Sequence, residues 1–359
     1  MGPIAQLVEL PAHNRMVGGS SPSGPTTFSF LSSTNGLKYL GGSLMKRILL
    51  VITILLTLSA LGATKYAGEI FSFSPGVRNQ AMGNTGITLH GFNSAAWWNP
   101  ANLAQSNLNG VELMRSEHFE GLLTQNQISL RLDNGIAFSI NHLAIDKIKL
   151  TKLEDENADL SNDNRPYVWK TVTNQDFILT AGFARRLNPH LALGLSPKLA
   201  YRSLAERSGY GIGADLGAFL DLGKGASLGA NLRDFFGTQI LWESGEHEIA
   251  LPNFEMELGY QVGLTGRQIP LQLAVRTQMY PEERGDASNF SSSGFSADLH
   301  AGLLLQVIPQ LSVMAGYDVD SFTAGMGLGI GNWGLDYAFR ANSNDGLGYS
   351  QRIAASLQW

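Results

Sequence analysis

The chain has 359 residues, of which 15% are charged, 44% are hydrophobic and 41 are glycines. Water-soluble domains average about 25% charged residues and about 7% glycine, so this composition argues against a pair of ordinary soluble domains. The net charge of −5 argues against a nucleic-acid partner, and the absence of cysteine excludes disulfides, thiolate metal sites and cysteine catalysis.

The first 62 residues predict export. A basic start at Met45, Lys46 and Arg47 precedes an apolar run of about 15 residues and then small residues, which is the order of a secretory signal peptide over residues 45–62. The run is shorter than the ~20 residues of a spanning helix, so a membrane anchor is the weaker alternative. Residues 1–44 show no periodicity, and we expect them to be a spurious upstream extension of a protein that starts at Met45.

From about Val111 to Trp359, apolar and polar residues alternate with a period of two, which is typical of β-strands between two environments. Between Phe254 and Leu264, for example, every second residue is apolar. The segments last about ten residues, as a tilted strand across a bilayer does, whereas soluble strands average about five or six. We therefore expect a transmembrane antiparallel β-barrel, all-β in class, rather than a soluble sandwich. Further segments with this pattern are 271–276, 295–303, 311–320, 333–340 and 347–359.

The length of this region predicts the number of strands. Residues 109–359 supply about 14 strands if each strand and its connection take about 18 residues, and an even count fits bacterial barrels. Pro197 lacks a backbone donor and predicts a bulge in its strand. Longer polar segments predict outward loops, and tight turns predict connections on the inner side. The outward loops are expected at 152–166, 236–252 and 281–293, and the inner turns at 133–135 and 223–225.

Charged side chains on the polar faces of the strands are candidates for the barrel lumen. No motif predicts a catalytic group, a cofactor or a metal, since the histidines are dispersed and no pair has zinc-binding spacing. Ser296, Asp298 and His300 share one face, but alternate strand residues lie about 6.6–6.8 Å apart, too far for direct hydrogen bonds along the strand. We therefore expect a protein that is not an enzyme. The candidate lumen-facing residues are Glu255, Arg276, Asp298, Asp336 and Arg340.

The segment before the first strand carries a family resemblance. Residues 68–104 resemble the opening of the PorV/PorQ family of outer-membrane proteins, which has an Arg-x-x-x-Met-Gly stretch followed by Trp-Asn-Pro-Ala. The Asn-Pro-Ala element is shared with the wider group of FadL-like barrels. The matching residues are Arg78, Met82-Gly83 and Trp98-Asn99-Pro100-Ala101, and later blocks lie at 209–217, 231–234, 315–325 and 336–339.

This resemblance implies a FadL-like barrel of about 14 strands with an N-terminal plug, residues 63–108, in or under the lumen. The four residues Trp98, Asn99, Pro100 and Ala101 would then belong to the structure of the plug. Asn99 is expected to cap a short helix whose first turn tolerates Pro100. A ligand-binding role for Trp97 and Trp98 is the alternative.

The family resemblance also implies a function. It predicts a non-enzymatic role in protein secretion at the cell surface, with type IX secretion components or secreted cargo as partners. A FadL-like channel for uptake of hydrophobic small molecules is the alternative, and an adaptor for another envelope protein is a third. Each places the barrel in outer-membrane lipid of a Gram-negative-type bacterium. The last strand ends on Trp359 and resembles the signal read by the barrel insertion machinery.

Overall fold

The computed structural model describes residues 68–264, 269–342 and 348–359. The expected signal peptide at 45–62 and the expected upstream extension at 1–44 lie outside these residues. No helix in the described part of the chain is long and apolar enough to cross a membrane.

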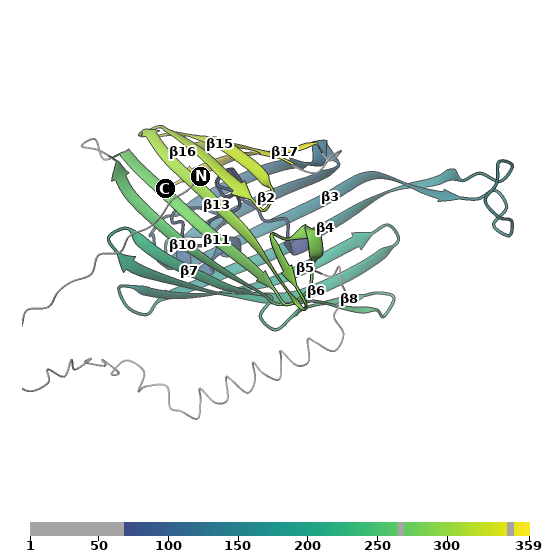
Figure 1. The fold of residues 1–359 in the computed structure, drawn as a ribbon, viewed down its shortest axis with the longest axis horizontal. Coiled ribbons are helices and arrows are strands. Elements are labelled where there is room, and N and C mark those ends of the chain that lie inside the picture. Colours follow the sequence, from purple (N-terminus) through teal and green to yellow (C-terminus); the bar gives the residue numbers. More distant parts are fainter. Residues whose placement is uncertain (1–67, 265–268, 343–347) are drawn as a thin grey trace, which may run out of the picture. The chain divides into compact units, whose positions relative to one another are not determined.

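A closed β-barrel dominates the described structure (Figure 1). Of the described strands, 14 form the ring, and each pairs antiparallel with the next. The last strand pairs with the first, with Leu357 opposite Val111, so the wall has no free edge along this seam. The ring strands are β1 (Gly110–His118), β2 (Leu123–Leu132), β3 (Ile136–Lys152), β4 (Tyr167–Arg186), β5 (Leu191–Leu204), β6 (Arg207–Gly223), β7 (Ala226–Arg233), β10 (Asn253–Leu264), β11 (Ile269–Tyr280), β13 (Phe295–Ile308), β14 (Leu311–Asp318), β15 (Ser321–Ile330), β16 (Trp333–Ala341) and β17 (Tyr349–Gln358).

The two ends of the barrel differ. One end, called the outer end, carries the longer connections between β3 and β4, β7 and β10, and β11 and β13. The other, the inner end, carries tight turns such as those after β2 and β6. The segment expected as a loop at 236–252 contains a hairpin instead, formed by β8 (Thr238–Trp242) and β9 (His247–Ala250), which extends the wall because β8 pairs with β6. Shorter elements at the outer end are η3 (Phe119–Gly121), η4 (Gly285–Ala287) and β12 (Phe290–Ser292).

The outer halves of β3 and β4 continue beyond the barrel as a two-stranded arm (Figure 1). Within this arm Ile148 pairs with Val172 and Lys152 pairs with Tyr167. Apolar side chains on the arm are exposed, with Val168 at 50%.

The barrel wall is apolar outside and polar inside, which is the reverse of a soluble sandwich. On β10 the outward Leu258 is 55% exposed, whereas the neighbouring inward Glu257 is fully buried. The same contrast holds on β2, where Ile128 faces outward and Arg131 is buried. An apolar outer face and a polar interior are typical of a transmembrane barrel.

The bulge expected at Pro197 is not present. Pairing between β4 and β5 runs through Thr180 opposite Lys198 and Phe183 opposite Leu195, and both pairs have the same register. Between these two pairs, β4 and β5 have no paired residues. The missing N–H of Pro197 therefore coincides with a short gap in the pairing and not with an extra residue in the strand. On the other side Pro197 stays in register with Ala214 of β6.

Residues 68–109 form a plug inside the barrel. The plug contains η1 (Glu69–Phe71), α2 (Val77–Ala81), α3 (Ala95–Trp98) and η2 (Pro100–Ala104). Its helices contact opposite parts of the wall. The α2 helix contacts β14 to β17, and η2 contacts β4 to β6 on the other side of the ring. Ile70, Trp97 and Trp98 form an apolar cluster with Leu143 and Ile178 of the wall.

Candidate functional site

The Trp-Asn-Pro-Ala motif lies in the plug, where α3 ends and η2 begins. Asn99 is fully buried and its side chain makes three hydrogen bonds. The Oδ1 atom accepts from the Ala101 N–H at 3.0 Å, which caps η2, and Nδ2 donates to the carbonyls of Ile87 at 2.9 Å and Ala218 at 3.0 Å. Pro100 occupies the first turn, where a missing N–H costs nothing. The Trp98 indole donates to the Pro75 carbonyl at 2.8 Å. These contacts tie the plug to itself and to β6.

Glycines of the wall allow the plug backbone to approach closely. A Cβ atom at Gly194 on β5 would lie 2.8 Å from Pro100 Cβ, and one at Gly302 on β13 would lie 2.7 Å from Met82 Cβ. Real Cβ atoms essentially never lie closer than 3.0 Å to another heavy atom, so an alanine at either place would displace the plug. The high glycine content of the chain therefore has a packing role where these strands meet the plug.

Glu257 on β10 holds plug residues 86–88, which we call the strap. Its carboxylate accepts hydrogen bonds from the Gly86 N–H and the Thr88 N–H, both at 2.8 Å, and from the Thr88 hydroxyl at 2.6 Å. Hydrogen bonds to an ionised acceptor are about twice as strong as neutral ones. Strand alternation places Glu257 on the polar face but gives no reason to single it out.

Asparagines of the plug bind the carbonyl groups of the same region. Asn102 Nδ2 donates to the Ile87 carbonyl at 2.8 Å and to the Leu89 carbonyl at 3.0 Å. Asn99 adds its bond to Ile87. The strap is thus bound to β10 through the N–H groups of Gly86 and Thr88, and to η2 and its cap through the Ile87 carbonyl, so these buried backbone groups have partners.

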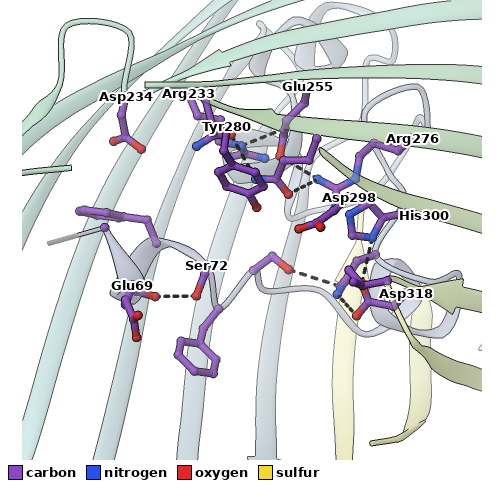
Figure 2. A pocket seen from close by; sticks show the side chains of 18 of the residues that line it. Glu69, Ser72, Arg233, Asp234, Glu255, Arg276, Tyr280, Asp298, His300 and Asp318 are labelled. Carbon is purple, nitrogen blue, oxygen red and sulfur yellow. Dashed lines mark hydrogen bonds and ion pairs between the residues drawn. The ribbon is translucent and has the colours of Figure 1, made fainter. Parts of the chain in front are cut away.

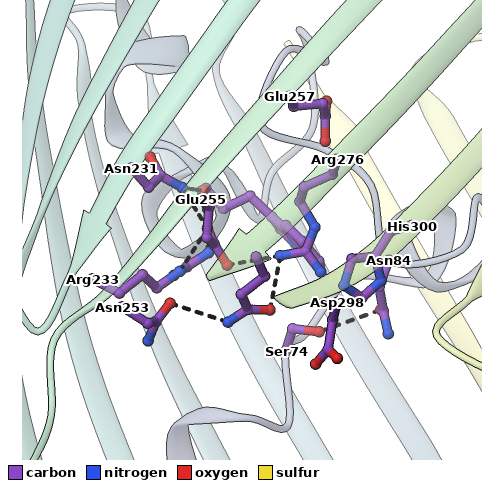
Figure 3. A network of polar contacts seen from close by, with 12 residues as sticks. Ser74, Asn84, Asn231, Arg233, Asn253, Glu255, Glu257, Arg276, Asp298 and His300 are labelled. Atoms are coloured by element: carbon purple, nitrogen blue, oxygen red, sulfur yellow. Dashed lines mark hydrogen bonds and ion pairs between the residues drawn. The ribbon is translucent and has the colours of Figure 1, made fainter. Parts of the chain in front are cut away.

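Two of the predicted lumen residues, Glu255 and Arg276, meet in one buried network (Figure 3). Glu255 on β10 binds Arg233 Nε at 3.0 Å, Arg276 Nη1 at 2.7 Å and Asn231 Nδ2 at 2.9 Å. Arg233 and Asn231 also donate to the carbonyls of Trp97 and Trp98, so the network anchors the end of α3. Arg276 lies over the Trp98 ring at 5.3 Å, within cation–π range.

The other three predicted residues lie apart from this network. Asp298 pairs with Arg284 at 2.6 Å, and Arg340 pairs with Asp318 at 3.3 Å. Asp336 binds Arg78 of α2 at 2.9 Å and so fastens the opposite side of the plug.

Ser296, Asp298 and His300 form no hydrogen bond with one another. His300 Nδ1 is bonded to Asp318 of the next strand at 2.8 Å. The buried Ser296 hydroxyl has no hydrogen-bond partner. This arrangement offers no activated nucleophile.

A second ion cluster lies beside the first on β5, β6 and the turn after β7. Lys198 Nζ lies 2.8 Å from Asp215 and 2.7 Å from Asp234. Burial raises the pKa of the Asp234 carboxyl above its ordinary value, and the nearby Lys198 ammonium opposes that shift. The Lys198 ammonium also lies 4.5 Å from the centre of the Phe71 ring, which belongs to the plug.

A cavity of about 640 Å³ lies above the plug at the outer end (Figure 2). The plug contributes aromatic surface from Phe71, Phe73, Trp97 and Trp98, and the wall contributes Tyr280. Most of the charged groups around it take part in the ion pairs described above. Three buried nitrogens in the lining, Arg276 Nε, His300 Nε2 and Arg340 Nε, have no hydrogen-bond partner. The cavity therefore combines a few aromatic faces with many polar and charged groups, so it is more polar than the usual small-molecule site, which is mostly apolar.

A smaller cavity of about 310 Å³ lies at the inner end. It is lined by Thr88 and His90 of the plug and by Phe219, Gly259 and Gln272 of the wall. Among the residues that the structure describes, no group of three His, Asp or Glu could hold a metal ion.

These features define a plugged antiparallel β-barrel with a ring of 14 strands among the described residues. No protein-family model and no curated protein sequence matches the chain. Among solved structures it is similar to the Pseudomonas putida toluene transporter TodX, with 13% identity and a TM-score of 0.50 over 79% of this chain and 96% of that chain.

Two other solved structures are similar over the same share of this chain. They are the Ralstonia pickettii toluene transporter TbuX, with 13% identity, a TM-score of 0.47 and 97% of that chain covered, and a Pseudomonas aeruginosa FadL homologue, with 11% identity, a TM-score of 0.47 and 97% covered. No family model and no curated sequence supports the PorV/PorQ family specifically, so that resemblance stays a prediction.

Proposed function

We propose that the chain is a non-enzymatic outer-membrane channel for the uptake of hydrophobic small molecules. The observation that carries this proposal is the outer cavity, where four plug aromatics form one side of a space large enough for a small molecule. The apolar exterior of the wall supports a position in a lipid bilayer, and the longer loops at the outer end support an outward orientation. The similarity to TodX, a toluene transporter, supports the same class of substrate.

The aromatic side of the cavity gives a direct test. Phe71 and Phe73 are half-buried plug residues that line the cavity. We expect F71A/F73A to reduce the uptake of a hydrophobic fluorescent probe into proteoliposomes by about tenfold, because that ratio needs a combined loss of only about 1.4 kcal/mol from two half-buried rings, and full burial of one is worth about 1.5–3 kcal/mol. The control is F322A on the outward face of β15, where Phe322 is 73% exposed. Equal uptake by wild-type and F71A/F73A protein would contradict the proposal.

The secretion role implied by the PorV/PorQ resemblance is the second candidate. The arm favours this role, because its exposed apolar side chains lie well outside the barrel (Figure 1). At that position they could contact a secreted protein. Deletion of the gene should then leave type IX cargo unprocessed or absent from the surface. Replacement of residues 147–172 by a short turn should have the same effect while leaving probe uptake intact. Normal cargo in both strains would exclude this role.

A further inference from the structure

We propose that the strap, residues 86–88, is the barrier between the outer and inner cavities, and that Glu257 is the residue that keeps it closed. This inference rests on the proposed uptake function, because it concerns the route that a substrate takes after it has entered the outer cavity. It assigns a positioning role to Glu257 and leaves the identity of the substrate open.

The inward residues of β10 connect the two cavities. Glu255 lines the outer cavity, and Gly259 lines the inner cavity. Glu257 lies between them, and successive inward residues of a strand are about 6.6–6.8 Å apart. Figure 3 shows Glu257 beyond Glu255 on the same strand. The strap crosses the lumen face at this residue, so it lies on the shortest path along β10.

The next strand repeats this arrangement. Arg276 on β11 is opposite Glu257 and lines the outer cavity. Ala274 is opposite Gly259, and Gln272 lines the inner cavity. The β10–β11 pair therefore forms a continuous face from one cavity to the other. On this face the small residues Gly259 and Ala274 lie opposite each other, directly on the inner side of Glu257 and Arg276.

The contact between strap and wall is specific. Three donors of the strap, the Gly86 and Thr88 N–H groups and the Thr88 hydroxyl, converge on one carboxylate, and both Glu257 and Thr88 are buried. Beside them, Ile87 packs against Gly229 of β7, which is the partner of Glu257 in the β7–β10 ladder. Larger residues at Gly229 and Gly259 would leave no room for the strap, so the wall is shaped to receive it.

On the side away from Glu257, the strap is bound to η2 of the plug. Asn102 and Asn99 bind the Ile87 carbonyl of the strap and belong to η2 and its cap. Opening the path therefore requires loss of the hydrogen bonds to Glu257, while the asparagine contacts keep the released strap attached to η2. A single wall side chain thus determines whether the strap is closed.

Conductance of potassium chloride through the purified full chain in planar bilayers tests this role. We expect E257A, which removes three hydrogen bonds to the carboxylate, to raise the open probability by about tenfold or more, because loss of even one charge-assisted hydrogen bond corresponds to that ratio. E257Q keeps the shape but loses the charge, and T88V loses only the hydroxyl, so both should give smaller increases. Unchanged conductance in E257A would overturn the proposal.

The matched control is D336N, which breaks the Arg78 contact of the plug away from the path between the cavities. If D336N opens the barrel as much as E257A does, the plug is loosened as a whole and the strap is not the barrier. Migration of unheated protein in gels shows that each variant is a folded barrel. Because the readout uses ions, a failure of hydrophobic uptake with normal gating would contradict the proposed function and not the role of Glu257.

Discussion

Gly217 on β6 and Pro100 in η2 are in direct contact: a Cβ atom at Gly217 would lie 2.8 Å from Pro100 Cδ. The glycine therefore makes room for the Asn-Pro-Ala turn of the plug. Since β6 and η2 are more than a hundred residues apart in the sequence, the fit depends on the closed barrel.

We expect G217A to destabilise the seated plug by about 1–3 kcal/mol, the usual cost of overpacking a filled interior. The measurement is protease susceptibility of the plug in folded, reconstituted barrel. Gly329 on β15 provides the control, because it follows the same inward alternation as Gly327 but a Cβ atom there would meet nothing within 4 Å. G329A should change stability by no more than about 1 kcal/mol. Equal protection in G217A and wild-type would show that η2 can shift without cost.

Removal of the Glu255 carboxylate should destabilise the whole barrel. E255A leaves the guanidiniums of Arg233 and Arg276 buried without this partner, and breaking such a pair costs about 3–5 kcal/mol. Urea unfolding in lipid vesicles measures the loss. E246A is the control, because Glu246 pairs with Arg207 at the surface, where side chains are 56% and 62% exposed and a pair is worth less than about 1 kcal/mol. Similar losses in both variants would mean that burial of the network adds nothing.

An aspartate at position 102 should make the plug sensitive to pH. Asn102 donates to two carbonyls, and in N102D a carboxylate would face them without a proton to donate. The folded plug then favours the neutral acid, so the pKa of the new carboxyl rises and plug protection returns as the pH falls through that raised value. Hydrogen exchange of the plug amides at pH 7 and pH 5 measures this. N102A loses the same donors without adding charge and should show no recovery in acid.

The medium around the wall can be tested with two equally exposed residues. Leu258 on β10 is 55% exposed and Val168 on the arm is 50% exposed. L258R should cost about 2–4 kcal/mol of folding free energy in a bilayer, because the charge would face hydrocarbon. V168R lies beyond the barrel and should stay within about 0.5 kcal/mol. A mild effect of L258R would argue against lipid contact at mid-wall.

The strand pattern was predictable because each strand has an apolar outer face and a polar inner face. Successive residues point to opposite faces, so apolar and polar residues alternate in the sequence. The fold class, the closed ring of 14 strands and the plug followed from it and from the motif around Asn99. The β8–β9 hairpin was not predicted, since its strands are short and the surrounding residues are polar.

The site was less predictable than the fold. Alternation places Glu255 and Glu257 on the same face but cannot show that one binds arginines and the other binds backbone amides. That difference depends on which part of the plug lies next to each of the two glutamates in the lumen. The prediction of a bulge at Pro197 was wrong for a related reason. The sequence shows that Pro197 lacks an N–H donor, but not whether the neighbouring strand has a carbonyl that would otherwise accept a hydrogen bond from it.

The way α2 is fastened has a consequence for biogenesis. Arg78 and Gly76 of the plug are bound by Asp336 on β16 and by Arg352 on β17, which lie more than 250 residues further along the sequence. These contacts can form only when β16 and β17 are in place, so we expect α2 to reach its final position late in the assembly of the barrel. A variant truncated before Asp336 would lack the anchor for this helix even if its earlier strands had paired.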